Sequence, residues 1–240
     1  MTDGKVYSEG GDAVHGCYTN VKINITGGEI SSLHGRGIIT YGATTIENCT
    51  ISTVDSAALR TAYAPQITIR NSTLSSECNT FQSSTIYARS SSGSGVVLKL
   101  ENTNIINKKG RGIYAHGTAS SCPCNVTIDG GTWNCEMQCV YSYARSVITV
   151  NGGFFESYHD GRTCHVGSSS GNLIINDGYF RNDNSTQTTV ARYDTSTALT
   201  IVGGYYTNKV AKVADGYSLY SGSYKDPNGK SYQYRVGVSK

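Results

Sequence analysis

One pattern of apolar and polar positions recurs along most of the chain. Two apolar residues, separated by one residue, precede a polar residue, a turn of two residues, one further residue and a large apolar or aromatic residue, as in residues 23–30. The second apolar residue, the anchor, recurs at intervals of 21 to 31 residues that average about 25. The eight anchors are Ile25, Ile46, Ile69, Leu100, Ile128, Val150, Ile175 and Ile201. Self-similarity at a fixed period predicts stacked repeats, one per copy.

The columns of this repeat predict its local geometry. Anchors and the large residues five positions later are expected to point inward, whereas the mostly polar residues before the anchors are expected to point outward, as in a strand with one buried face. The first turn position is always Gly, Asn or Asp, which adopt left-handed backbone conformations most readily. We expect this conformation at Gly27, Asn48, Asn71, Asn102, Gly130, Gly152, Asp177 and Gly203.

A second apolar segment follows each of the first seven turns. These segments are residues 37–41, 58–62, 85–89, 112–116, 139–145, 163–166 and 189–193. Two or three short strands per 25 residues, with one sharp turn at a fixed place, predict an all-β parallel solenoid of about eight coils. A β-sandwich would need hairpins every 8 to 12 residues and a propeller about 40 residues per blade, so the period fits neither.

The repeat over about residues 20–214 resembles the single-stranded, right-handed parallel β-helix proteins of the pectin-lyase-like superfamily. Coil length and the frequent asparagine at the sharp turn carry the resemblance. The superfamily includes bacterial surface adhesins and phage tail spike and fibre proteins. Because this fold hosts unrelated functions, the resemblance implies a fold and leaves the function to the site residues.

The two ends of a solenoid need covering, because an open strand edge can pair with other chains. We expect residues 1–20 to form an N-terminal cap, residues 21–214 the parallel β-helix, and residues 215–240 a C-terminal antiparallel flap. The sequence Asp-Pro-Asn-Gly at 226–229, between tyrosine-rich segments, predicts a β-hairpin in this flap.

Composition narrows the class of protein further. Gly, Ser, Thr and Asn make up 100 of the 240 residues and Leu only 8, which excludes a helical bundle, while 18 tyrosines exclude ordinary disorder. A net charge of +3 indicates no nucleic-acid partner, and no apolar stretch reaches the roughly 18 residues that would insert in a membrane. We expect a protein of the extracellular space, a cell surface or a virion. Residues 1–20 contain no apolar signal-peptide segment, so the chain is expected to be either a mature fragment behind a new Met or a protein made and used without secretory export.

The second strands predict an outward ladder of aromatic and cationic side chains. If residues such as Ile113 and Val140 point inward, their neighbours stack outward on successive coils. The predicted ladder contains Arg60, Tyr87, Arg89, Tyr114, His116, Tyr141, Tyr143, Arg145 and His165. Aromatic rings beside cations suit sugar rings and the carboxylates or sulfates of acidic glycans. The alternative is that these tyrosines simply favour strands and cover the backbone.

A second outward ladder is predicted four residues after the last three anchors. It consists of Phe154, Tyr179 and Tyr205. Such an apolar patch could pack subunits together, for example in a homotrimer. The alternative is that the C-terminal flap covers it.

No catalytic pair is predicted, because the Tyr, His and Arg ladder contains no Asp or Glu for a glycosidase. Neither a cofactor nor a metal is expected, because a zinc site at His116 would lack the usual cysteine spacing. One or two disulfides could form in an oxidising setting among Cys122, Cys124, Cys135 and Cys139. The leading hypothesis is a non-enzymatic structural or recognition module that binds surface polysaccharides. The alternative is a polysaccharide lyase acting on acidic glycans, with Tyr, His and Arg as base, acid and carboxylate neutraliser.

Overall fold

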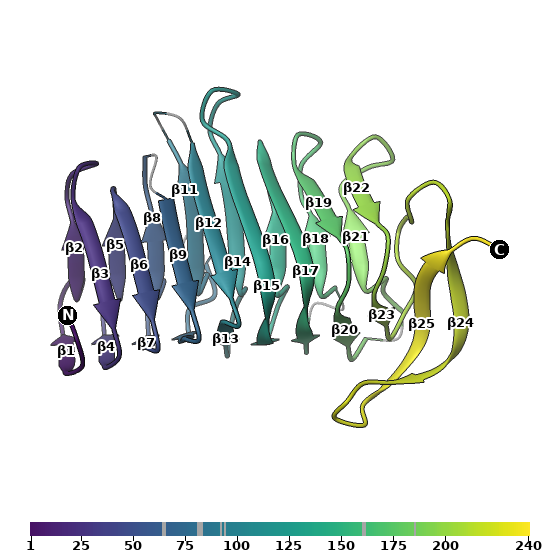
Figure 1. Ribbon diagram of the computed structural model, residues 1–240, viewed down its shortest axis with the longest axis horizontal. Helices are drawn as coiled ribbons and strands as arrows, with labels where there is room; N and C mark the ends of the chain where they lie inside the picture. The colour runs from purple at the N-terminus through teal and green to yellow at the C-terminus, as the bar shows by residue number, and fades with distance from the viewer. Residues whose placement is uncertain (64–65, 81–83, 92, 94, 160–161, 185) are drawn as a thin grey trace.

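The fold is a parallel β-solenoid of about eight turns (Figure 1). The computed structural model describes residues 1–63, 66–80, 84–91, 93, 95–159, 162–184 and 186–240. All regular structure in these ranges is β-strand, which confirms the predicted all-β class. No helix in the described part of the chain is long and apolar enough to span a membrane.

Each coil contributes strands to three faces of the rod, and the strands of each face are parallel. The first face, which carries the anchors, contains β3 (Lys22–Thr26), β6 (Ala43–Glu47), β9 (Gln66–Arg70), β12 (Val96–Glu101), the first halves of β15 (Cys124–Cys135) and β17 (Ser146–Ser157), β19 (Asn172–Ile175) and β22 (Ala198–Ile201). The second face, after the sharp turn, contains β1 (Lys5–Ser8), β4 (Glu29–Ser32), β7 (Thr50–Thr53), β10 (Thr73–Ser76), β13 (Asn104–Asn107), the second halves of β15 and β17, β20 (Tyr179–Asn182) and β23 (Tyr205–Tyr206). The third face is a separate eight-stranded sheet of β2 (Val14–Gly16), β5 (Ile38–Thr40), β8 (Leu59–Thr61), β11 (Ile86–Ser90), β14 (Ile113–Gly117), β16 (Val140–Ser142), β18 (Cys164–Val166) and β21 (Val190–Arg192).

The core fills the inside of the rod with equivalent side chains from successive coils. Parallel pairing places Ile25 beside Ile46 and Ile46 beside Ile69. All eight anchors and all eight large residues that follow them are buried in one cluster, which confirms both inward columns. Near the C-terminal end this column becomes aromatic: the rings of Phe155, Phe180 and Tyr206 stack with centroids 4.9 and 5.1 Å apart. Burial of these apolar surfaces is the main force that holds the coils together.

The sharp turn is left-handed in every coil, but its position shifts. In the first five coils it includes the predicted residues Gly27, Asn48, Asn71, Asn102 and Gly130. In the last three coils the prediction is wrong by one position, because the residues with positive φ are Gly153, Gly178 and Gly204 instead of Gly152, Asp177 and Gly203. The buried aromatic residue two positions later explains the shift: a Cβ atom on Gly178 would lie 3.0 Å from the ring of Phe180, so only glycine fits there.

The two ends of the rod differ. β1 and β2 pair in parallel with β4 and β5, so residues 1–20 supply a further rung at the N-terminal end. At the other end β24 (Tyr217–Lys225) and β25 (Ser231–Val238) form the predicted antiparallel hairpin, and β25 pairs antiparallel with β23 (Figure 1). A buried Asp226 carboxylate accepts hydrogen bonds from the backbone N–H groups of Asn228 and Lys230 and so fixes the hairpin turn.

Candidate functional site

The third face brings the residues of the predicted ladder into register. One outward residue from each strand forms a continuous column: His15, Ile39, Arg60, Tyr87, Tyr114, Tyr141, His165 and Ala191. Their chain neighbours, such as Ile113 and Ala115, lie in the core. We call Tyr87, Tyr114 and Tyr141 the third-face ladder.

The tyrosines of this ladder are buried, so the expectation of exposed, stacking ring faces is wrong. Tyr87, Tyr114 and Tyr141 are only 4%, 8% and 9% exposed, with ring centroids 5.7 and 5.4 Å apart. With Ala57 and Tyr143 they form an apolar cluster separate from the core. Each ring covers the next, and Tyr141 extends over Gly167, where a Cβ atom would lie 2.0 Å from the phenol oxygen. The ring faces are therefore unavailable to a sugar.

Arginine side chains, rather than tyrosines, give this face its chemical character. The Arg60 guanidinium lies 5.6 Å from the ring centroid of Tyr87, and that of Arg111 lies 5.1 Å from Tyr141. Arg89 pairs in register with His116, whose ring lies 5.2 Å from Tyr143 in an edge-to-face contact, and Arg145 is exposed. The His165 ring lies 5.1 Å from that of Tyr141, and Arg145 acts electrostatically on His116, so all nine predicted residues lie on or beside this face, together with further cations.

Three arginines of this face were missed by the sequence analysis. Arg36, Arg111 and Arg162 precede the third-face strands and act electrostatically on Arg60 or His165. The signal was present as the tripeptide Arg-Gly-Ile, which occurs at 36–38 and again at 111–113, directly before two of these strands.

Most of this positive charge has no carboxylate partner. Asp12 forms an ion pair with Arg36, at 3.3 Å. Within the described part of the chain, Arg60, Arg89 and Arg162 form no ion pair, and the buried Nε atom of each has no hydrogen-bond partner. A buried donor left unpaired costs about 1–3 kcal/mol. Within the described residues, these three guanidinium groups of the third face therefore lack an anionic partner.

The pKa values of His165 and His116 are lowered in part by arginines of this face. Burial, then Arg162 and Arg111, lowers the pKa of His165 to about 4. Burial, then Arg89 and Arg145, also lowers the pKa of His116. Both imidazoles are neutral at pH 7. Burial raises the pKa of Tyr114, so its phenol stays protonated and is a poor general base for the lyase alternative.

The second outward ladder is covered by the hairpin. Phe154, Tyr179 and Tyr205, which we call the second-face ladder, stack with ring centroids 5.1 and 4.9 Å apart. Tyr232 packs on Tyr179 at 5.5 Å, and Tyr224 packs on Tyr205 at 5.7 Å. The flap thus covers this ladder, as the alternative expected, and occupies part of the surface proposed for subunit packing.

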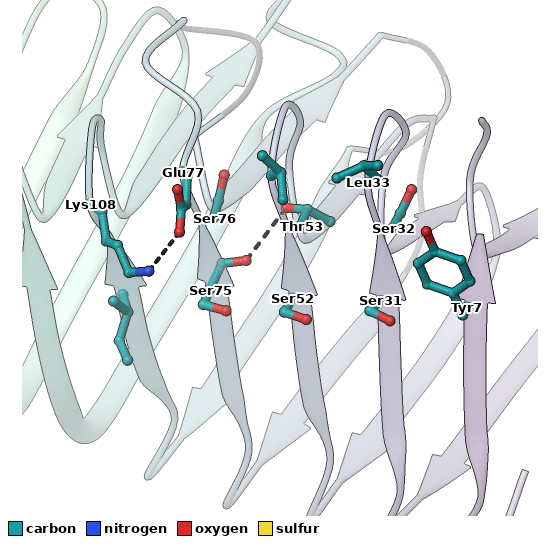
Figure 2. A pocket seen from close by; sticks show the side chains of 12 residues that line it. Tyr7, Ser31, Ser32, Leu33, Ser52, Thr53, Ser75, Ser76, Glu77 and Lys108 are labelled. Carbon is teal, nitrogen blue, oxygen red and sulfur yellow. Dashed lines mark hydrogen bonds and ion pairs between the residues drawn. The ribbon is translucent and has the colours of Figure 1, made fainter. Parts of the chain in front are cut away.

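A groove on the second face has a different character. It has a volume of about 270 Å³, and Figure 2 shows the side chains of Ser31, Ser52 and Ser75 side by side between Tyr7 at one end and Lys108 at the other. Lys108 forms an ion pair with Glu77 at 2.6 Å. The charges of this groove are thus balanced, and its lining combines serine and threonine hydroxyl groups with the apolar side chains of Leu33, Val54 and Ile106.

The cysteines form no disulfide in this structure. Cys17 is exposed and the other seven thiols are buried. The Cys139 thiol donates a hydrogen bond to the carbonyl oxygen of Glu156 at 3.2 Å, and burial raises the pKa of Cys124 to about 12. Among the residues described, no three His, Cys, Asp or Glu side chains gather as ligands for a metal, at His116 or elsewhere.

Comparison of the chain with protein-family models, with curated proteins and with solved structures finds no match. Family membership, and with it the adhesin or tail-spike identity, is not established by relatives. The parallel β-solenoid with its hairpin cap is established by the strand pairing itself. The chain is thus classified by its fold.

Proposed function

We propose that this protein is a non-enzymatic recognition module that binds a linear acidic polysaccharide along its third face. The observation that carries the proposal is the row of arginines without carboxylate partners beside the buried third-face ladder. Guanidinium groups bind carboxylates and sulfates through paired, charge-assisted hydrogen bonds. An anion on this face would supply the charge partner that the guanidinium groups of Arg60, Arg89 and Arg162 lack within the described residues.

The repeat of the fold suits a polymeric ligand. Successive coils are about 4.8 Å apart, so cationic side chains of successive strands follow one another along the rod axis. A linear chain of acidic sugars lying parallel to that axis would meet the guanidinium groups of Arg60 and Arg89 and then the neutral imidazole of His116. The buried ring of Tyr87 keeps the Arg60 side chain in place by packing and cation–π contact.

An acidic glycan fits better than a nucleic acid. Proteins that bind single strands rely on aromatic faces on which bases stack, and those of Tyr87, Tyr114 and Tyr141 are buried. The net charge of +3 is also modest for a partner with one phosphate per nucleotide.

The setting that we propose is a bacterial surface adhesin or a phage tail spike or fibre component. Such proteins meet surface polysaccharides outside the cell, and a rod with a long lateral binding face suits that encounter. Assembly as a homotrimer would be compatible with the third face remaining exposed.

The test is binding to immobilised polygalacturonate and heparin, with dextran and poly(dT) as neutral and nucleic-acid comparisons. The wild type is expected to bind an acidic glycan with strong salt dependence, and the double variant Arg60→Gln/Arg89→Gln to bind at least about tenfold more weakly. Arg70→Gln is the matched control, because Arg70 lies on the first face and pairs with Glu101. Its affinity should stay within about twofold of the wild type.

Three results would contradict the proposal. Equal binding to dextran would exclude anion recognition, and tighter binding to poly(dT) would indicate a nucleic-acid protein. Release of unsaturated uronides, followed by absorbance, would show a lyase and overturn a purely binding role.

A further inference from the structure

An aromatic pocket lies at the N-terminal end of the third face. It has a volume of about 420 Å³ and is lined by His15, Cys17, Tyr18, Thr19, Tyr41 and Tyr63. The rings of Tyr41 and Tyr63 lie 4.9 Å apart, and the His15 ring stacks on Tyr41 at 6.1 Å. Tyr18 is 71% exposed and Tyr63 is 40% exposed. In contrast to the third-face ladder, this pocket presents open ring faces.

The pocket is continuous with the row of arginines. His15 stands in the same outward column as Arg60, separated from it by Ile39 of the intervening strand. Tyr41 lies two residues beyond Ile39, close enough to Arg60 to act on the pKa of that guanidinium. A polymer that lies along the arginines therefore reaches this pocket at one end.

Tyr63 is held in an unusual conformation. Its φ of 64° is left-handed, which a bulky side chain rarely adopts and which costs of order 1–3 kcal/mol. The hydroxyl of Ser90 donates a hydrogen bond to its carbonyl oxygen at 3.4 Å. In this conformation the ring lies beside that of Tyr41, tilted by 33° to it, at the edge of the pocket.

We infer that this pocket binds one pyranose ring of the same acidic polysaccharide, an inference that rests on the proposed function. The apolar face of a sugar ring stacks on tyrosine faces, and its hydroxyls can pair with the phenol groups and Thr19. An organic cation is disfavoured, because Arg36 and Arg60 lie nearby and the Asp12 carboxylate is already paired with Arg36 and His15.

The experiment compares a hexamer of galacturonate on the wild type and on Tyr18→Ala/Tyr63→Gly. Glycine at 63 removes the ring and also relieves the left-handed strain, so a loss of binding does not reflect lost folding. The expected result is about 5- to 20-fold weaker binding with an unchanged dependence on salt, because only stacking is lost. Tyr193→Ala is the matched control, since Tyr193 is an exposed tyrosine just after the last strand of the same face, and it should bind as the wild type does.

The outcomes separate the two proposals. If the wild type binds no acidic glycan, the proposed function fails and this inference fails with it. If the wild type binds the hexamer and the tyrosine variant binds equally well, this inference alone is wrong. If the variant loses binding to poly(dT) but not to the hexamer, the pocket stacks bases and not sugar rings.

Discussion

Two aromatic ladders lie on the outside of the same rod, and they differ in what covers them. The second-face ladder of Phe154, Tyr179 and Tyr205 lies beneath the C-terminal hairpin. The charges beside it are balanced, because Glu156 pairs with Arg181 and with Lys230 of the hairpin. The third-face ladder has no such balance: the cations beside it include Arg60 and Arg89, which have no carboxylate partner within the described residues.

The difference teaches that stacked aromatic residues do not by themselves identify a binding site. Both ladders arise from the same cause, since parallel strands in register place like residues side by side. The second-face ladder is structural, because the charges beside it are paired and the hairpin of the same chain covers it. At the third-face ladder the neighbouring cations Arg60 and Arg89 lack partners within the described residues, so an external anionic ligand would stabilise the protein there.

Removing the cover from the second-face ladder should have the largest effect. Asp226→Ala leaves two backbone N–H groups of the hairpin turn and the hydroxyl of Tyr232 without their acceptor. We expect the free energy of unfolding to fall by about 3 kcal/mol in urea titrations, with polygalacturonate binding unaffected. Asp215→Ala, which removes an exposed carboxylate outside the turn, should change little. An unchanged urea midpoint for Asp226→Ala would show that the hairpin is not needed as a cover.

Acidification should weaken the third-face region specifically. His165 has a pKa of about 4 in the folded protein, below the value of about 6.5 in an unfolded chain. The unfolded state therefore takes up the proton first, so this stability is complete above pH 6.5 and is lost as the pH falls towards 4. We expect the wild type to lose about 1 to 2 kcal/mol more than His165→Gln between pH 6.5 and 5.

The same pH series with polygalacturonate present sharpens this result. A bound polyanion raises the pKa of a nearby histidine, so the loss on acidification should become smaller. Parallel stability curves for the wild type and His165→Gln would contradict the assigned electrostatics of the third face.

Neutralising one charge beside each ladder should change the free energy of unfolding by small amounts in opposite directions. Glu156→Gln removes the partner of two cations and should cost about 1 kcal/mol of unfolding free energy. Arg89→Gln removes a cation that has no partner in the described part of the chain, together with its unpaired buried Nε donor, so it should raise the free energy of unfolding by up to about 1 kcal/mol. Equal losses in thermal or urea unfolding would show that the two ladders are electrostatically alike.

Much of the fold follows from the sequence because its cause is local. The anchors alternate with polar residues over a period of two, and the residues at 226–229 form a turn by themselves, so both can be derived from neighbours in the chain. The shift of the left-handed position to Gly153 and Gly178 could not, because it depends on how the rings of Phe155 and Phe180 fill the core.

For the candidate site, the sequence predicts which residues come together, but not their burial or their charge pairing. Register alone places Tyr114 beside Tyr141. Their burial depends on residues distant in sequence, such as Ala57, and on the missing side chain of Gly167. Ion pairing likewise depends on the three-dimensional arrangement, because the sequence does not show which carboxylates lie within reach of Arg60.

The stacking of the coils also fixes the spacing of side chains along the third face. Residues paired in register on successive strands, such as Arg89 and His116, are separated by the hydrogen-bonding distance between strands, about 4.8 Å, which no side-chain substitution can alter. A polymer whose anionic groups repeat at another interval falls out of phase after a few units, however well one unit fits. Selectivity on such a surface would therefore depend on the period of the ligand, and would sharpen as the ligand grows longer.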